Sequence, residues 1–163
     1  MRTKISFDPI SRQSIEIAIR KLEAYKRSVE KKTNLLCERL ATLGATRVSI
    51  EYSRVGEIAT DGKGMPEIEV ENDGDVWKIL ANGEEAVFIE FGSGAMYGYG
   101  HPEPQGFGPG TYPSIKKHWN DPKGWYTPMG QHTYGNAPTA GMWQAREDIK
   151  DNLKRIAKEV FNG

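Results

Sequence analysis

Apolar residues recur at three- and four-residue steps over the first quarter of the chain, which is the spacing of one helix face. Asp8 followed by Pro9, and then Ser11, are residues that favour the start of a helix. Gly44 follows the last apolar position, as a helix C-cap does. We therefore predict a helix over residues 11–43 with this apolar stripe: Ile15, Ala18, Ile19, Leu22, Tyr25, Val29, Leu36, Leu40 and Leu43.

This predicted helix is long for the size of the chain. At about 1.5 Å per residue it would span about 50 Å, whereas a radius of about 13 Å for 100 compact residues implies a diameter of about 26 Å. Part of the helix is therefore expected to project and to need a partner over its apolar stripe. Lys31, Lys32 and Thr33 interrupt the stripe, so a break or kink there is the alternative that would shorten the rod.

Alternating apolar and polar residues then predict β structure. Residues 72–75 and the pair Asn82-Gly83 have the composition of tight turns, and residues 61–64 that of a hairpin loop. Short strands joined by tight turns predict an antiparallel meander. The four expected strands are residues 47–54, 66–71, 76–80 and 86–91.

Residues 92–137 show little helical or strand periodicity. They hold ten of the 18 glycines, six of the nine prolines, five of the seven tyrosines and all three histidines. A connection of this length exceeds an ordinary loop, so we expect it to be functional or to become ordered on contact. Within it, residues 114–119 have the composition of one or two helical turns.

A second amphipathic stripe closes the chain, with Asn136 as a candidate cap and Pro138 near the first turn. We expect this helix to pack on the sheet. The prediction is a single α+β domain over residues 1–163: a helix over 1–44, a four-stranded antiparallel sheet over 45–91, a long loop over 92–137 and a helix over 138–163.

Composition sets the broad class. With 37% hydrophobic and 27% charged residues the chain is expected to fold as a globular protein. A single cysteine, Cys37, excludes an intramolecular disulfide framework and a multi-cysteine metal site. Neither a transmembrane stretch nor a secretory signal is recognisable, so we expect a soluble protein made in a reducing cytoplasm, with no membrane partner.

The net charge of zero hides a strong segregation of charge. Residues 1–44 carry ten basic and five acidic residues (+5), residues 45–91 four and eleven (−7), and residues 92–163 eight and six (+2). Unlike patches of this kind can attract copies of one chain head to tail, although solvated faces that merely differ in sign would look the same.

Three histidines, His101, His118 and His132, lie in the long loop near Glu103 and Asp121. Their spacings of 17 and 14 residues follow no short metal-ligand motif, and loop histidines beside aromatic residues are more often hydrogen-bonded packing residues. We therefore predict no metal site and no cofactor.

Catalytic motifs are also not recognisable. Cys37 has no evident general base, and the sequence Gly92-Ser93-Gly94 lacks the surroundings of a nucleophile elbow. Glu90 stands out at the end of an apolar run, and we expect it to accept N–H groups of the Gly92–Gly94 turn. We predict no catalytic residue.

Basic residues in the first helix could follow phosphates, but interleaved glutamates at helical spacing also give an ordinary solvated face, so nucleic acid is not expected as the primary partner. The basic residues are Arg20, Lys21, Arg27, Lys31 and Lys32.

The segment from Val87 to Gly94, VFIEFGSG, resembles the hydrophobic-Glu-Phe/Tyr-Gly-Ser/Thr-Gly signature of the tail-component family of tailed bacteriophages and prophages. The order of a long charged helix, a small sheet, a loop and a closing helix is similar too. So is the entry to the last helix, with Pro138, Met142, Trp143 and Ala145. The long loop departs from the family pattern.

This resemblance implies a structural protein of the neck or tail, acting in tail completion or head–tail joining, with no catalytic residues to carry over. The expected partners are other tail or head-connector ring proteins and further copies of the chain. The expected location is the virion, after assembly in the host cytoplasm. The alternative is a metal- or carboxylate-dependent hydrolase of the cell envelope that uses Glu90 and the loop histidines.

Overall fold

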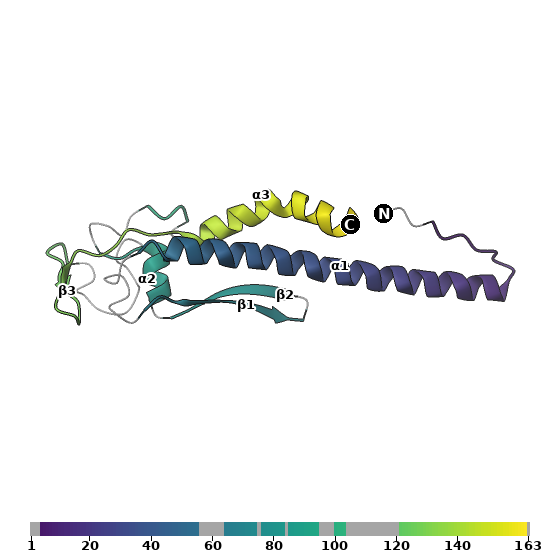
Figure 1. The fold of residues 1–163 in the computed structure, drawn as a ribbon, viewed down its shortest axis with the longest axis horizontal. Helices are drawn as coiled ribbons and strands as arrows, with labels where there is room; N and C mark the ends of the chain where they lie inside the picture. The colour runs from purple at the N-terminus through teal and green to yellow at the C-terminus, as the bar shows by residue number, and fades with distance from the viewer. Residues whose placement is uncertain are drawn as a thin grey trace. The chain divides into compact units, whose positions relative to one another are not determined.

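The computed structural model describes residues 4–55, 64–74, 76–83, 85–94, 100–103 and 121–162. The chain divides into two compact units, residues 1–40 with 152–163 and residues 41–151. The elements, drawn in Figure 1, are α1 (Arg12–Tyr52), β1 (Glu67–Asp73), β2 (Val76–Asn82), α2 (Glu85–Phe91), β3 (Trp125–Tyr126), β4 (His132–Thr133) and α3 (Gly141–Asn162).

The first unit is built from the amino-terminal part of α1 and the last turns of α3. Ser11 caps α1, because its Oγ accepts the N–H of Ser14 at 3.3 Å. The helix then runs through residues 31–33, so the alternative of a break there is wrong. Lys32 Nζ donates to the carbonyl of Phe161 at 3.2 Å, which ties the two helices together within this unit.

Helix α1 does not end at Gly44, which corrects the predicted C-cap and the predicted strand over residues 47–54. Val48 and Tyr52 are buried, whereas Ile50, which a strand would place on the same face as both, is 46% exposed. Gly44 itself is buried where Ile79 and Ile149 approach the helix, since a Cβ there would lie 2.6 and 2.9 Å from their Cδ1 atoms.

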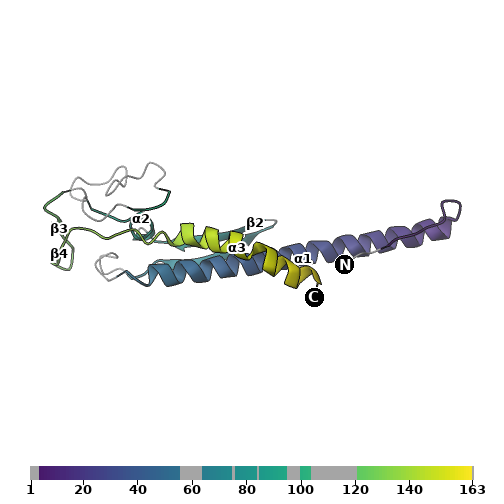
Figure 2. The same ribbon diagram turned by 90° about the horizontal axis from the view of Figure 1, so that it is seen from above.

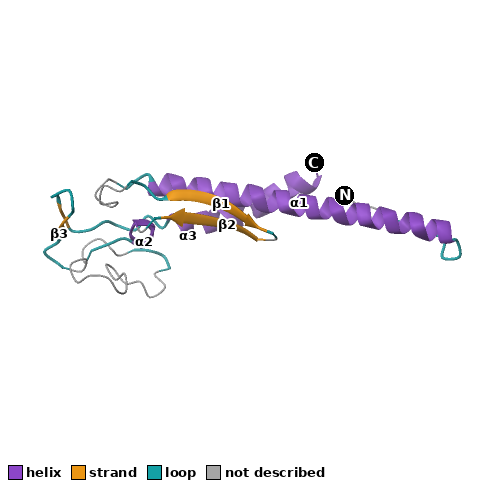
Figure 3. Cartoon of the chain, turned by 90° about the horizontal axis from the view of Figure 1, so that it is seen from below, coloured by secondary structure: helices purple, strands orange, loops and turns teal. Residues whose placement is uncertain are grey.

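The sheet is a two-stranded hairpin instead of the predicted four-stranded meander. Strands β1 and β2 pair antiparallel from Glu67–Asn82 to Asp73–Val76, as Figure 3 shows. The expected fourth strand is helix α2, whose buried residues Ala86, Ile89 and Glu90 have helical spacing.

The core of the second unit joins these elements. Its buried cluster draws on the carboxyl-terminal part of α1, on α2 and on α3, while one face of the β1–β2 hairpin packs against it. The closing helix therefore exists as predicted but begins at Gly141 instead of residue 138. The cluster consists of Val48, Tyr52, Ala86, Ile89 and Ala145, with Ile68, Ile79, Ala81 and Met142 beside it.

Part of the predicted loop over residues 92–137 is regular. Strands β3 and β4 form a short antiparallel hairpin with Trp125 opposite Thr133, and both views in Figures 1 and 2 place it at the same end of the second unit as α2. The predicted turns at 114–119 and most of the predicted loop 61–64 lie outside the described residues. Among the helices described, none combines the length and the apolar character needed to cross a membrane.

Candidate functional site

The segment that carries the signature contributes to the buried core of the second unit. Helix α2 presents Glu90, which is only 5% exposed, towards the amino end of α3. The carboxylate accepts the backbone N–H groups of Met142 (2.9 Å) and Trp143 (3.2 Å). These amides belong to the first turn of α3, where N–H groups have no partner within the helix and where negative charge is favourable. Glu90 is therefore the acceptor that starts α3.

Two side chains complete the surroundings of Glu90. Tyr52 donates its hydroxyl to Oε2 at 3.2 Å, and His101 Nε2 lies 3.0 Å from Oε1. A carboxylate offers about four lone-pair positions, so four donors leave none of them for a further ligand. The expected partners, the amides of the Gly92–Gly94 turn, are not among them, and that prediction is wrong.

The carbonyl end of α2 is joined to the segment that leads into α3. The backbone N–H groups of Thr139 and Ala140 donate to the carbonyls of Ile89 (2.9 Å) and Glu90 (3.1 Å). Asn136 Nδ2 donates to the carbonyl of Phe88 at 3.0 Å. Asn136 thus satisfies the end of α2 instead of capping the closing helix, which is a further correction.

Ser93 and Asn136 form an isolated antiparallel bridge, with N–H to carbonyl distances of 2.9 and 3.1 Å. The bridge brings two backbones together at glycines. Gly94 has a φ of 82°, and a Cβ on it would lie 2.0 Å from the carbonyl oxygen of Tyr134. Only glycine tolerates both the left-handed conformation and this close approach. The Gly-Ser-Gly part of the signature therefore lets the backbone at residues 93–94 pack directly against the backbone at residues 134–136.

His101 is held on both sides of its ring. Its Nδ1 accepts the N–H of Glu103 at 3.0 Å, so Nε2 carries the proton that is donated to Glu90. The Phe91 ring lies 4.5 Å away, centroid to centroid. Glu103 accepts two hydrogen bonds from Arg146, at 2.6 and 2.7 Å, and these bonds lower the pKa of Glu103. Residues 101–103 are therefore fastened to both α2 and α3.

The two described histidines, His101 and His132, have separate partners. His132 lies between the rings of Tyr126 and Tyr134 and makes a 3.0 Å hydrogen bond with the carbonyl of Lys123. His118 lies outside the described residues. Over the part of the chain that the structure describes, no three histidine, cysteine or acidic side chains are grouped as ligands for a metal ion.

Tyr52 supplies a test of the buried network. Burial, reinforced by the negative charge of Glu90 and their hydrogen bond, raises the pKa of the Tyr52 hydroxyl far above its usual value. The folded state then holds the phenolic proton to higher pH than the unfolded state, so the free energy of unfolding falls as the pH rises above about 10. We expect Tyr52→Phe to flatten this alkaline slope in urea titrations, and Tyr126→Phe, at a 72% exposed position, to leave it unchanged.

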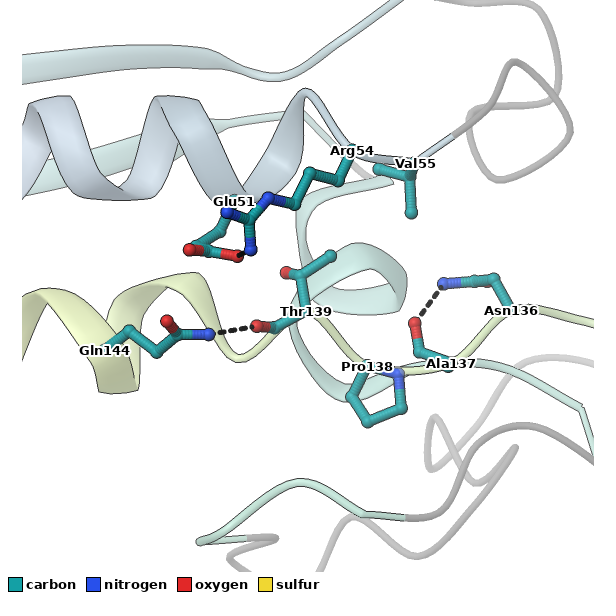
Figure 4. A pocket seen from close by; sticks show the side chains of 8 residues that line it. All are labelled: Glu51, Arg54, Val55, Asn136, Ala137, Pro138, Thr139 and Gln144. Atoms are coloured by element: carbon teal, nitrogen blue, oxygen red, sulfur yellow. Dashed lines mark hydrogen bonds and ion pairs between the residues drawn. The ribbon is translucent and has the colours of Figure 1, made fainter.

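A second polar feature lies beside this network. A pocket of about 480 Å³, shown in Figure 4, is bordered by the end of α1, residues 136–139 and Gln144. Glu51, 2% exposed, lies at its wall and pairs with Arg54 and with Arg47, whose Nη2 is 3.1 Å from Oε1. Arg47 also donates to Gln144 and lies 3.6 Å from Asp148. These opposite charges offset one another, so the cluster fastens α1 to α3 within the second unit.

Glu51, Tyr52 and Gln144 belong to the site although no sequence motif marks them. Residues 47–54 were expected to form a strand, which would set Glu51 and Tyr52 on opposite faces. The signal that identifies them is the series Val48, Tyr52 and Val55 at helical spacing.

Comparisons with known proteins give no match to this chain, whether with family models, with curated proteins or with solved structures.

Proposed function

We propose that the chain is a structural component of the neck or tail of a tailed bacteriophage or prophage. In this proposal it acts in tail completion or head–tail joining, through ring-like assembly with copies of itself and with tail or head-connector proteins. It is made in the host cytoplasm and ends in the virion. The resemblance of residues 87–94 to the family signature supplies the class of protein.

The observation that carries the proposal is the exposure of large apolar side chains on the amino-terminal part of α1. Ile19, Leu22 and Tyr25 are 49%, 55% and 42% exposed, and they lie on one helix face. Exposure of three such neighbours is unfavourable for a helix that stays in water, since burying the half of each side chain that is still exposed would gain roughly 1 kcal/mol. A partner subunit that covers this face in the assembly would explain why these apolar side chains are exposed in the single chain.

The chemistry around Glu90 supports the same conclusion. Its carboxylate receives donors from α1, α3 and His101, and the Ser93–Asn136 bridge fixes the adjoining backbone. Side chains used in this way hold elements together. The signature thus supports a role in maintaining a rigid subunit of an assembly.

The proposal is tested in the phage or prophage that encodes the chain. We expect disruption of the gene to give filled heads and tails that are not joined, as seen by negative-stain electron microscopy, and the purified protein to restore joining. Joined, infectious particles in the absence of the gene product would contradict the proposal.

A point substitution sharpens this test. We expect Leu22→Glu to reduce complementation by about tenfold or more, because the interface must then bury a carboxylate. The circular dichroism of the purified variant should match that of the wild type, since Leu22 is exposed in the free chain. Gln13→Glu, which adds the same charge at an exposed polar position of the same helix, is the control and should complement normally.

A further inference from the structure

Helix α1 has a second exposed face in addition to the one that carries Ile19, Leu22 and Tyr25. Ile17, Arg20, Ala24, Arg27, Lys31 and Leu35 follow one another at three- and four-residue steps, so they share one side of the helix, and all six are exposed. Within the described residues, Arg20, Arg27 and Lys31 make no ion pair or hydrogen bond. This face, named here the basic face, therefore offers three cations between two apolar residues, Ile17 and Leu35.

The β1–β2 hairpin carries the complementary surface. Its carboxylates alternate with the residues that pack on the core, so Glu67, Glu69, Glu71 and Asp73 lie on the outer side of β1. Opposite them on β2 are Val76, which is 53% exposed, Lys78, Leu80 and Asn82, so the outer face carries four carboxylates and one cation. Asp73 is paired with Lys78 at 2.9 Å and Glu69 with Asn82 at 2.8 Å, whereas Glu67 and Glu71 have no such partner among the described residues.

The charged residues of the two surfaces have opposite signs and are spaced over similar distances. Arg20 and Lys31 are about 16 Å apart along the helix axis, and Glu67 and Glu71 are about 13 Å apart along the strand. Pairing of the basic face with a second basic face would set like charges against one another. Pairing with the hairpin joins cations to carboxylates and covers apolar residues on both sides.

We propose that the basic face of α1 docks on the outer face of the β1–β2 hairpin of a second copy of the chain. The contact is heterologous, because the basic face of one copy binds the hairpin of the next copy. Such contacts build rings or filaments. The inference rests on the proposed function, whose self-assembly it assigns to particular residues. A net charge of zero favours a second copy over nucleic acid, because the chain itself supplies the counter-charge.

A charge exchange between two variants tests this contact. The double variant Glu67→Lys, Glu71→Lys reverses the charge at two positions on the outer face of the hairpin. The double variant Arg20→Glu, Arg27→Glu does the same on the basic face of the helix. Measured by sedimentation velocity at low salt, the wild type should associate, and each variant alone should lose association by about tenfold or more. An equimolar mixture of the two should recover it, since each reversed surface then meets its opposite. Recovery also shows that both variants are folded.

Lys154→Glu with Lys158→Glu is the matched control, because it makes the same change of net charge at exposed positions of α3 and should leave association unchanged. Association of the wild type should weaken by about tenfold between about 0.05 and 0.5 M salt. A wild type that stays monomeric at low salt, a mixture that fails to associate, or a helix variant that loses only duplex DNA binding would overturn the inference.

The two proposals fail in different ways. A monomeric wild type together with unjoined heads and tails in the gene disruption would remove this contact and leave the proposed function in place. Charge-dependent association together with normal virions in the disruption would remove the proposed function and leave the contact in place.

Discussion

Glu90→Ala is expected to lower the free energy of unfolding by about 3 kcal/mol or more, because it removes the shared acceptor of several buried hydrogen-bond donors. The substitution leaves the amides of Met142 and Trp143 and the hydroxyl of Tyr52 without their acceptor. Each orphaned donor in a buried site costs about 1–3 kcal/mol. Urea unfolding monitored by circular dichroism measures the loss.

Two variants make the result specific to the network. Gln has nearly the same shape as Glu and keeps one acceptor oxygen. The Glu90→Gln variant should therefore lose less stability than the Glu90→Ala variant. Glu67→Ala removes an exposed carboxylate and should change the free energy of unfolding by no more than about 0.5 kcal/mol. Equal stability of Glu90→Ala and Glu67→Ala would show that Glu90 does not hold the three helices together.

The second large effect is expected at Gly94. In Gly94→Ala the new Cβ meets the carbonyl oxygen of Tyr134 at 2.0 Å, a distance that requires the backbone to move. The movement separates Ser93 from Asn136 and breaks both bridge hydrogen bonds. We expect a loss of about 3 kcal/mol or more, as the sum of left-handed strain of about 1–2 kcal/mol and the broken bonds.

Gly130 provides a closely matched control. Its φ of 78° is nearly that of Gly94, at 82°, but nothing lies within 4 Å of an added Cβ. Gly130→Ala should therefore show only the strain of about 1–2 kcal/mol. If the two variants lost equal stability, the close approach at the bridge would not matter, and the signature glycine would be needed for its conformation alone.

The sequence predicts the α+β class and the helices at the two ends, because their apolar stripes extend over several turns. It fails at residues 47–54, where Val48, Ile50 and Tyr52 suggest a strand. The alternation is real, but Ile50 lies on the exposed side of a helix. Gly44 misleads for a related reason, since it lies inside the helix, where the Ile79 and Ile149 side chains approach, and not at a turn.

The site was predictable only in part. Glu90 stands out in the sequence as a carboxylate at the end of an apolar run, and the structure does give it backbone N–H partners. Those partners belong to Met142 and Trp143, about fifty residues further along the chain. Local sequence shows which residue requires donors, but only tertiary packing decides which amides supply them.

The acceptor that starts α3 has a consequence for the order of folding. Glu90 and Met142 are 52 positions apart in the chain, and closing so long a segment has an entropy cost that must be met before the contact contributes. The amino end of α3 should therefore form late, and only together with the docking of α2. An isolated peptide of α3 should fray over its first turn, even in solutions where its later turns are helical.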